Sequence, residues 1–217
     1  MFTGIVEEIG TVHTIKKGST SMQLTIRCSH VLSDVKKGDS ISVNGVCLTV
    51  SEFSKTEFIA DVMPETFKAT TLFTLNPGSH VNLERAMAAN GRFGGHFVTG
   101  HVDCIGEIVA VRPIENAVYM DIQMEPELHS HLVPKGSITV DGTSLTIFGI
   151  SEQGFTISLI PVTQADSVLG HKRVGDYVNV ECDILAKYLE RIFSKKQTTE
   201  PTGGLTMDVL AKSGFLD

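Results

Sequence analysis

The sequence predicts an all-β chain of two small antiparallel barrels followed by one C-terminal α-helix. Three observations carry this prediction. The chain repeats itself once, most of each repeat alternates apolar and polar residues with a period of two, and the last apolar stretch changes to helical spacing. A length of 217 residues is enough for two domains, each with its own hydrophobic core.

The second half of the chain returns sequence blocks of the first half in the same order. The matching blocks are 3–6 with 99–102, 37–38 with 135–136, 43–50 with 140–147, 63–66 with 160–163, and 78–84 with 175–181. Chance does not preserve order over such a length, so we predict two homologous domains, 1–96 and 97–186. The glycine-rich residues 88–96 form the connector between them.

Within each repeat, short alternating runs separated by turn residues predict antiparallel strands. Asn44-Gly45 and Asp141-Gly142 are typical of two-residue hairpins. Pro64 and Pro161 are expected to end a strand and to begin a short helical turn. Strands of this length at intervals of about ten residues favour a small barrel over an open sheet.

The C-terminal unit, residues 187–217, differs in kind from the repeats. Apolar residues at three- and four-residue spacing from Ile184 to Phe193 predict an amphipathic helix. Residues 194–204 are polar and contain Pro201, so they are expected to be disordered. Residues 207–212 could add one or two helical turns, ended by Gly214.

Composition excludes several classes of protein. The net charge is −7 and no basic stripe stands out, so nucleic acid is not an expected partner. The sequence has neither a basic leader nor a run of 18 apolar residues. We therefore expect a cytoplasmic protein without a membrane span. The four cysteines form no Cys-x-x-Cys pair, which favours reduced thiols over disulfides or a structural zinc site.

A few polar residues could carry chemistry. His101 and Asp103 share one face of a strand, but two candidate ligands without the spacing of a zinc site do not predict a metal site. The alternative is a histidine hydrogen-bonded in a barrel mouth. Ser144 lies outside any Gly-x-Ser-x-Gly elbow, and its partner in the first repeat is Cys47. These two residues could line related pockets that have diverged, or simply pack behind a turn.

Asp183 stands just before the predicted C-terminal helix. It could be a solvated charge, an N-cap of that helix, or part of a site.

Six motifs together resemble the riboflavin synthase family. They are MFTGIVE at 1–7, NGVCLTV at 44–50, MPET at 63–66, VNLERA at 81–86, GGH at 94–96 with GHV at 100–102, and DGTSLT at 141–146. The resemblance covers about residues 1–190 in both repeats. It implies two six-stranded Greek-key barrels, each binding one 6,7-dimethyl-8-ribityllumazine, and a dismutation of two such molecules into riboflavin and 5-amino-6-(D-ribitylamino)uracil.

The resemblance also implies partners and the absence of a cofactor. The expected assembly is a homotrimer held by the C-terminal helix, with each site between the N-terminal barrel of one subunit and the C-terminal barrel of its neighbour. Lumazine synthase is a further expected partner. No external cofactor and no metal are expected. Which barrel holds the donor lumazine, and which residue adds to the acceptor ring, stay open.

The family's site residues carry over onto both repeats of this chain. The expected catalytic residues are Phe2, Cys47, His101, Ser144, Thr146 and Asp183. The first-repeat pocket is expected to comprise Gly4, Ile5, Val6, Cys47, Leu48, Thr49, Asp61, Val62, Met63, Pro64, Glu65 and Thr66. The second-repeat pocket is expected to comprise His101, Val102, Asp103, Lys135, Ser144, Leu145, Thr146, Ser158, Leu159, Ile160, Pro161, Val162 and Thr163. Phe2 and Asp183 are placed at the rim.

Two other classes of protein remain as alternatives. A fluorescent lumazine-binding protein would share the duplication but lack the polar set of the second barrel, which is present here. A flavin-dependent oxidoreductase is disfavoured because the sequence holds no dinucleotide-binding βαβ unit.

Overall fold

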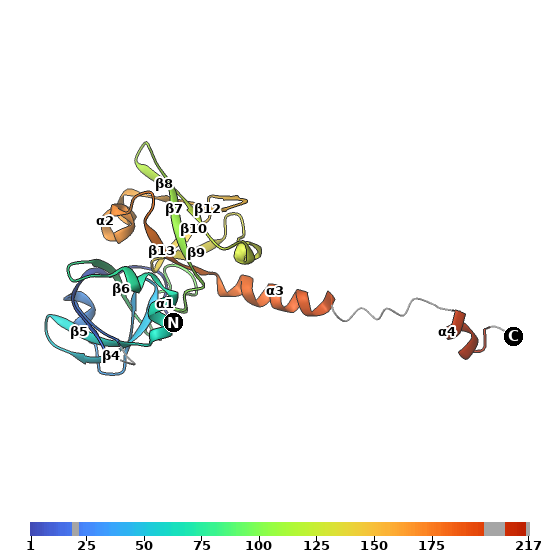
Figure 1. The fold of residues 1–217 in the computed structure, drawn as a ribbon, viewed down its shortest axis with the longest axis horizontal. Helices are drawn as coiled ribbons and strands as arrows, with labels where there is room; N and C mark the ends of the chain where they lie inside the picture. The colour runs from blue at the N-terminus through green and yellow to red at the C-terminus, as the bar shows by residue number, and fades with distance from the viewer. Residues whose placement is uncertain (19–21, 198–206, 216–217) are drawn as a thin grey trace.

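The computed structural model describes residues 1–18, 22–197 and 207–215. Figure 1 shows two β domains side by side, with a helix leading away from them toward the C-terminus. The predicted all-β class with a C-terminal helix is confirmed. The exact boundaries between the domains stay a prediction.

The first repeat is a closed barrel in the strand order β1-β2-β5-β4-β3-β6. Its order is not that of the chain, because β2 pairs with β5 and β3 returns to β6 in Greek-key fashion. The hairpin between β3 and β4 turns at Asn44-Gly45, both with positive φ, as a type I′ turn requires. The strands are β1 Glu8–Lys17, β2 Met22–Arg27, β3 Ser40–Val43, β4 Val46–Phe53, β5 Glu57–Val62 and β6 His80–Arg85.

The second repeat is a seven-stranded sheet in the order β10-β9-β13-β7-β8-β12-β11. Here the course of one strand is broken in two, since β10 and β11 are separated only by Ile147 and Phe148. The expected second six-stranded closed barrel is therefore corrected to a curved sheet whose two edges approach each other at this break. The strands are β7 Cys104–Ile114, β8 Ala117–Gln123, β9 Ser137–Val140, β10 Thr143–Thr146, β11 Gly149–Ser151, β12 Gly154–Leu159 and β13 Tyr177–Cys182.

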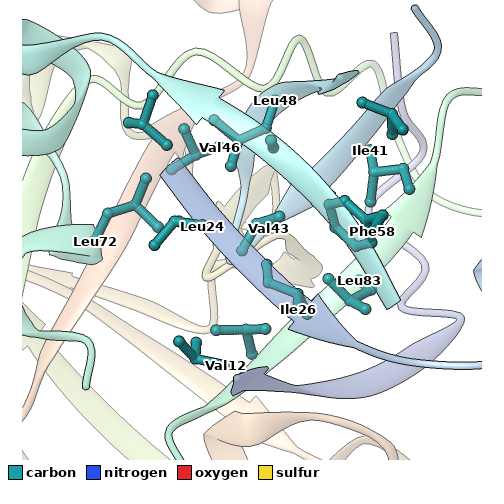
Figure 2. Packing of buried hydrophobic residues seen from close by; sticks show 14 of the residues in the cluster. Val12, Leu24, Ile26, Ile41, Val43, Val46, Leu48, Phe58, Leu72 and Leu83 are labelled. Atoms are coloured by element: carbon teal, nitrogen blue, oxygen red, sulfur yellow. The ribbon is translucent and has the colours of Figure 1, made fainter. Parts of the chain in front are cut away.

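Each repeat buries a separate core, because alternate strand residues point inward. Figure 2 shows the first core, in which Phe58 is fully buried among branched aliphatic side chains. The second core gathers around Phe155 and Met120. In both repeats a short helix begins at the proline where the sequence predicts one. They are α1 Pro64–Ala69 and α2 Pro161–Asp166, with 3₁₀ turns η1 His30–Leu32, η2 Thr71–Thr74, η3 Pro126–His131 and η4 Val168–His171.

The two repeats meet through buried asparagines that play equivalent parts. The Asn82 side-chain amide donates to the Asp141 carbonyl at 2.8 Å, and the Asn179 amide donates to the Asn44 carbonyl at 2.7 Å. Asn82 Oδ1 also accepts from the backbone of Val168, which begins η4. These reciprocal bonds satisfy the backbone of both hairpins and fix one repeat against the other.

Asp141 breaks the equivalence of the two hairpins. Its carboxyl is fully buried where the first repeat has Asn44, and burial raises the pKa of this carboxyl above its ordinary value. Oδ1 accepts from the Asn179 backbone N–H at 2.8 Å, but Oδ2 has no hydrogen bond and lies 3.5 Å from Lys172 Nζ. Lys172 follows η4, and Leu75 holds the corresponding place after η2.

The C-terminal helix α3, Ile184–Gln197, is held to the second repeat by its polar face. Lys187 Nζ lies 2.6 Å from Asp103, and Glu190 pairs with Ser130 and His131 of η3. The opposite side of the helix leaves large apolar side chains exposed, namely Leu185, Tyr188, Leu189, Ile192 and Phe193.

The structure corrects one expectation for the tail and confirms another. Helix α3 continues to Gln197, so the polar stretch expected to be disordered from 194 begins inside a helix. Residues 198–206 lie outside the described part of the chain. The predicted last helical turns are α4, Met207–Lys212, and Gly214 ends them with a positive φ and a Schellman-type pair of backbone bonds.

We predict that Asp141→Asn makes stability less dependent on pH. The pKa of a carboxyl in the unfolded chain is about 4. If folding raises that pKa, the folded protein loses stability as the pH rises above about 4, because the unfolded chain gives up its proton more readily. The asparagine retains an acceptor for Asn179 and carries no charge. The melting temperature of the variant minus that of the wild type should therefore grow as the pH rises above about 4.

The matched control is Asn44→Asp, which buries the same acid without a nearby lysine. It should lose about 1–3 kcal/mol at neutral pH, the cost of an unsatisfied buried group. A difference between Asp141→Asn and wild type that shrinks with pH would contradict the assignment.

Candidate functional site

The first turn of each repeat lies against the hairpin of the other repeat. The Ser144 amide donates to the Gly4 carbonyl at 2.7 Å, and the Cys47 amide donates to the Gly100 carbonyl at 2.9 Å. Val102, which follows that second turn, packs on the core of the first repeat. The residues that continue from Gly100 therefore belong with Cys47, and those that continue from Gly4 belong with Ser144.

These hydrogen bonds join segments that the expected pockets separate, since the expected first-repeat pocket takes Gly4–Val6 and the second takes 101–103. Which residues contact a ligand stays a prediction. We call Cys47–Thr49 with 100–102 the first wall, and Ser144–Thr146 with 4–6 the second wall.

Two buried glutamates hold the exchanged turns in place. Glu84 accepts hydrogen bonds from the Thr3 amide at 2.6 Å, the Thr3 hydroxyl at 2.7 Å and the Gly4 amide at 3.0 Å. Glu181 accepts the same three bonds from Thr99 and Gly100 at 2.7, 2.7 and 3.0 Å. Burial raises the pKa of both glutamates, and the bonds from the threonines oppose that rise.

Both turns require glycine. Gly4 and Gly100 have φ of +77° and +81°, and a Cβ on either would lie 2.6 Å from the Cβ of Ser144 or Cys47. Phe2 is fully buried beneath the second turn, within 2.9 Å of a Cβ on Gly100. Its expected place at the rim is therefore corrected, because its ring supports the turn and exposes no surface in this chain.

Sequence reasoning missed one residue, His96, that contacts the second wall. His96 Nδ1 lies 2.7 Å from Ser144 Oγ, and its Nε2 lies 3.1 Å from Thr139 Oγ1. Burial lowers the pKa of His96, which favours the neutral imidazole with one nitrogen donating and the other accepting. The available signal was the GGH motif at 94–96, which ends in His96.

The remaining expected residues fall at the ends of two equivalent strands. Asp61 and Val62 end β5 and lead through exposed Met63 into α1. Ser158 and Leu159 end β12 and lead through exposed Ile160 into α2. The members of α1 and α2 in the expected set are Pro64, Glu65 and Thr66, and Pro161, Val162 and Thr163.

Asp183 and Asp103 both act at the start of α3. Asp183 Oδ1 accepts from the Leu185 amide at 2.9 Å, so it caps the helix, which was one of the alternatives for this residue. Asp103 accepts from the Cys182 amide and pairs with Lys187. A cavity of about 640 Å³ lies beside this helix start and is lined by His101, Val102, Asp103, Ile184, Tyr188 and others.

Cys47 differs from the other thiols in its setting. Burial raises the pKa of Cys28, Cys104 and Cys182 to about 12, which leaves these thiols unreactive. Cys47 and Cys28 are both half-buried, but only Cys47 lies in the first wall. Among the described residues, no group of three or more His, Cys, Asp or Glu side chains could hold a metal ion.

Comparison with known proteins identifies the family. The lumazine binding domain model matches twice, at residues 3–86 and 99–183. Riboflavin synthase of Bacillus subtilis (strain 168) is 55% identical over 215 residues, which are 99% of this chain and 100% of that protein. The chain belongs to the riboflavin synthase family. Riboflavin synthase of Actinobacillus pleuropneumoniae is 49% identical over the same shares of both chains.

Solved structures of LumP share the family's fold. LumP complexed with 6,7-dimethyl-8-(1'-D-ribityl) lumazine has a TM-score of 0.76 and 27% identity, covering 84% of this chain and 99% of that one. LumP complexed with riboflavin has a TM-score of 0.78 at the same identity and coverage. No helix in the described part of this chain is long and apolar enough to cross a membrane.

We predict that Gly100→Ala damages the first wall. The new methyl group would clash with Cys47 and Phe2, in addition to the cost of the left-handed backbone, about 1–2 kcal/mol. Gly38→Ala is the matched control, because Gly38 has φ of +94° but no atom within 4 Å of the added Cβ. Thermal unfolding should show a larger loss for Gly100→Ala, and equal losses would contradict the close packing of this turn.

Proposed function

We propose that the two walls are the two substrate sites of a riboflavin synthase, each taking one 6,7-dimethyl-8-ribityllumazine. The family's enzymes dismutate lumazine. One molecule passes a four-carbon unit to the other, which yields one riboflavin and one 5-amino-6-(D-ribitylamino)uracil. Because both reactants are the same compound, the reaction needs two sites of similar shape that treat their ligands differently.

The observation that carries this proposal is the equivalence of the two walls combined with their divergence. Both walls are built from a glycine turn that is hydrogen-bonded to the strand after a hairpin. The residues at equivalent positions differ, because Cys47 in the first wall corresponds to Ser144 in the second, and His101 corresponds to Ile5. A binding protein without turnover would have no need of this second polar set. LumP, a ligand-binding relative, is also less similar to this chain than the named synthases.

The residues of the walls suit proton transfer and orientation. The 7-methyl group of the lumazine can lose a proton because the resulting charge spreads into the ring. The His101 imidazole can accept or donate a proton as a general base or acid, and Ser144, Thr146 and Cys47 can hydrogen-bond to the ring or add to its electrophilic carbon. The main contribution of the protein is to hold two rings in register, which is worth several kcal/mol of barrier.

The assembly we propose is a homotrimer in which the first wall of one subunit faces the second wall of its neighbour. Helix α3 supports it, because ion pairs at Lys187 and Glu190 fix its polar face and leave its apolar face outward. We place the protein in the cytoplasm, where its four free cysteines would stay reduced. We also propose lumazine synthase as a partner. We also propose that the domains comprise residues 1–96, 97–186 and 187–217.

The direct test is turnover. Purified protein should convert the lumazine to riboflavin with two substrates consumed per product, followed by flavin absorbance and by chromatography of the pyrimidine product. Addition of a chelator should leave the rate unchanged. Binding of lumazine without any riboflavin formed would favour the alternative of a fluorescent lumazine-binding protein, and loss of rate restored by zinc would contradict chemistry without a metal.

The inter-subunit arrangement predicts which damaged subunits can rescue each other. Cys47→Ala damages the first wall and Ser144→Ala damages the second. A co-expressed mixture can therefore form sites from two intact walls, with activity well above that of either variant alone. Each substitution must cost more than about tenfold, which corresponds to about 1.4 kcal/mol of barrier.

The control for this experiment follows from the exchanged turns. Cys47→Ala and His101→Ala damage the same wall, so their mixture should regain nothing. Sedimentation must confirm that the subunits have mixed. Equal rescue by both pairs, or rescue by neither in confirmed mixed trimers, would overturn the arrangement.

A further inference from the structure

Lys135 occupies a backbone position that the first repeat gives to glycine. The sequence blocks pair Lys37-Gly38 with Lys135-Gly136, but the structure aligns Gly38 with Lys135. The Gly38 amide donates to the Val50 carbonyl at 2.9 Å, and the Lys135 amide donates to the Ile147 carbonyl at 3.0 Å. Lys135 has φ of 66° where Gly38 has 94°. A lysine adopts this conformation only at a cost, which points to a use for its side chain.

The Lys135 ammonium lies over an aromatic ring. Its Nζ is 4.4 Å from the centroid of the Phe148 ring, within the range of a cation–π contact. Tyr119 packs edge-on against the same ring, with centroids 5.0 Å apart. In the described part of the chain no carboxylate pairs with Lys135, so its charge is available to a ligand.

The broken strand of the second repeat is what presents Phe148. Between β10 and β11, the Phe148 amide donates to the Thr156 carbonyl at 2.8 Å, and the side chain remains 51% exposed. In the first repeat β4 is one continuous strand with a shift in its pairing to β5 at this position, and the corresponding residue is Ser51, whose hydroxyl donates to the Ile59 carbonyl. The second repeat alone thus combines a lysine and an aromatic face at these two positions.

This pair lies beside the expected second-repeat pocket. Tyr119 is directly opposite Ser158 in the pairing of β8 with β12, and Phe148 follows two residues after Thr146. The ring face attracts the Lys135 ammonium, by about 0.5–1 kcal/mol for an exposed cation–π contact. The ring restricts the long, flexible lysine side chain to one region.

We propose that Phe148 is a positioning residue that holds the Lys135 ammonium where it stabilises the anionic form of a lumazine bound at the second wall. When the 7-methyl C–H bond breaks, its proton passes to a base and its electron pair spreads to a ring carbonyl oxygen. An ammonium at that oxygen lowers the energy of the anion. This inference rests on the proposed function and assigns the deprotonated lumazine to the second wall.

The test is a double-mutant cycle on Phe148 and Lys135. Phe148→Leu keeps apolar bulk and removes the ring, so kcat should fall about two- to fivefold with little change in KM, the range expected of an exposed cation–π contact. Phe148→Tyr should restore the wild-type rate. Lys135→Met should lower kcat further, and in that background Phe148→Leu should have no additional effect. Phe53→Leu, an exposed aromatic on β4 without a cation, is the matched control.

A second readout does not depend on turnover. The absorption spectrum of bound lumazine at fixed pH reports its anionic fraction, which should be lower in Phe148→Leu and in Lys135→Met than in wild type and Phe148→Tyr. Equal effects of Phe148→Leu with and without Lys135 would overturn the inference, because the ring would then act independently of the ammonium. A wild-type protein that binds lumazine but forms no riboflavin would instead refute the proposed function, and the spectra would still decide this inference.

Discussion

Two buried carboxylates determine how the candidate sites are built. Glu84 and Glu181 each accept three hydrogen bonds from a Thr-Gly turn, and those turns complete the walls at Ser144 and Cys47. Because each glutamate is nearly inaccessible, a missing donor would leave a buried charge without compensation. The close approach that results tolerates only glycine at the turns, so the walls, the exchange between repeats and the buried Phe2 all depend on these contacts.

The near-equivalence of the repeats explains how one chain can hold two related sites. Asn82 and Asn179 exchange matching bonds across the interface, which joins the hairpins back to back. Departures from this equivalence are concentrated in the second repeat. Asp141 with Lys172 replaces a neutral pair at the interface, and Lys135 replaces a glycine at the candidate pocket. In the proposed function, the shared residues give the two walls the same shape and the divergent side chains distinguish two identical ligands.

Helix α3 connects the candidate site to an exposed apolar surface. Lys187 pairs with Asp103, two residues after His101, and Asp183 caps the first turn of the helix. The helix cannot rotate freely without breaking these contacts. Its exposed apolar side is therefore held at a defined angle to the first wall, and the cavity beside His101 is shaped by the same contacts.

The sequence by itself determined the duplication, the two hairpins, the proline-started helices and the amphipathic α3, because each leaves a local pattern in residue type and spacing. It also identified Cys47 and Ser144 as counterparts. Only the tertiary structure decided that Gly4 closes the wall of Ser144, that Gly100 closes the wall of Cys47, that His96 bonds to Ser144, and that Lys135 stands in for Gly38. Alternation along a strand reports which residues share a face, but it carries no information on which distant segment supplies the next hydrogen bond. Those choices are set by the buried glutamates and by backbone bonds between segments far apart in the chain.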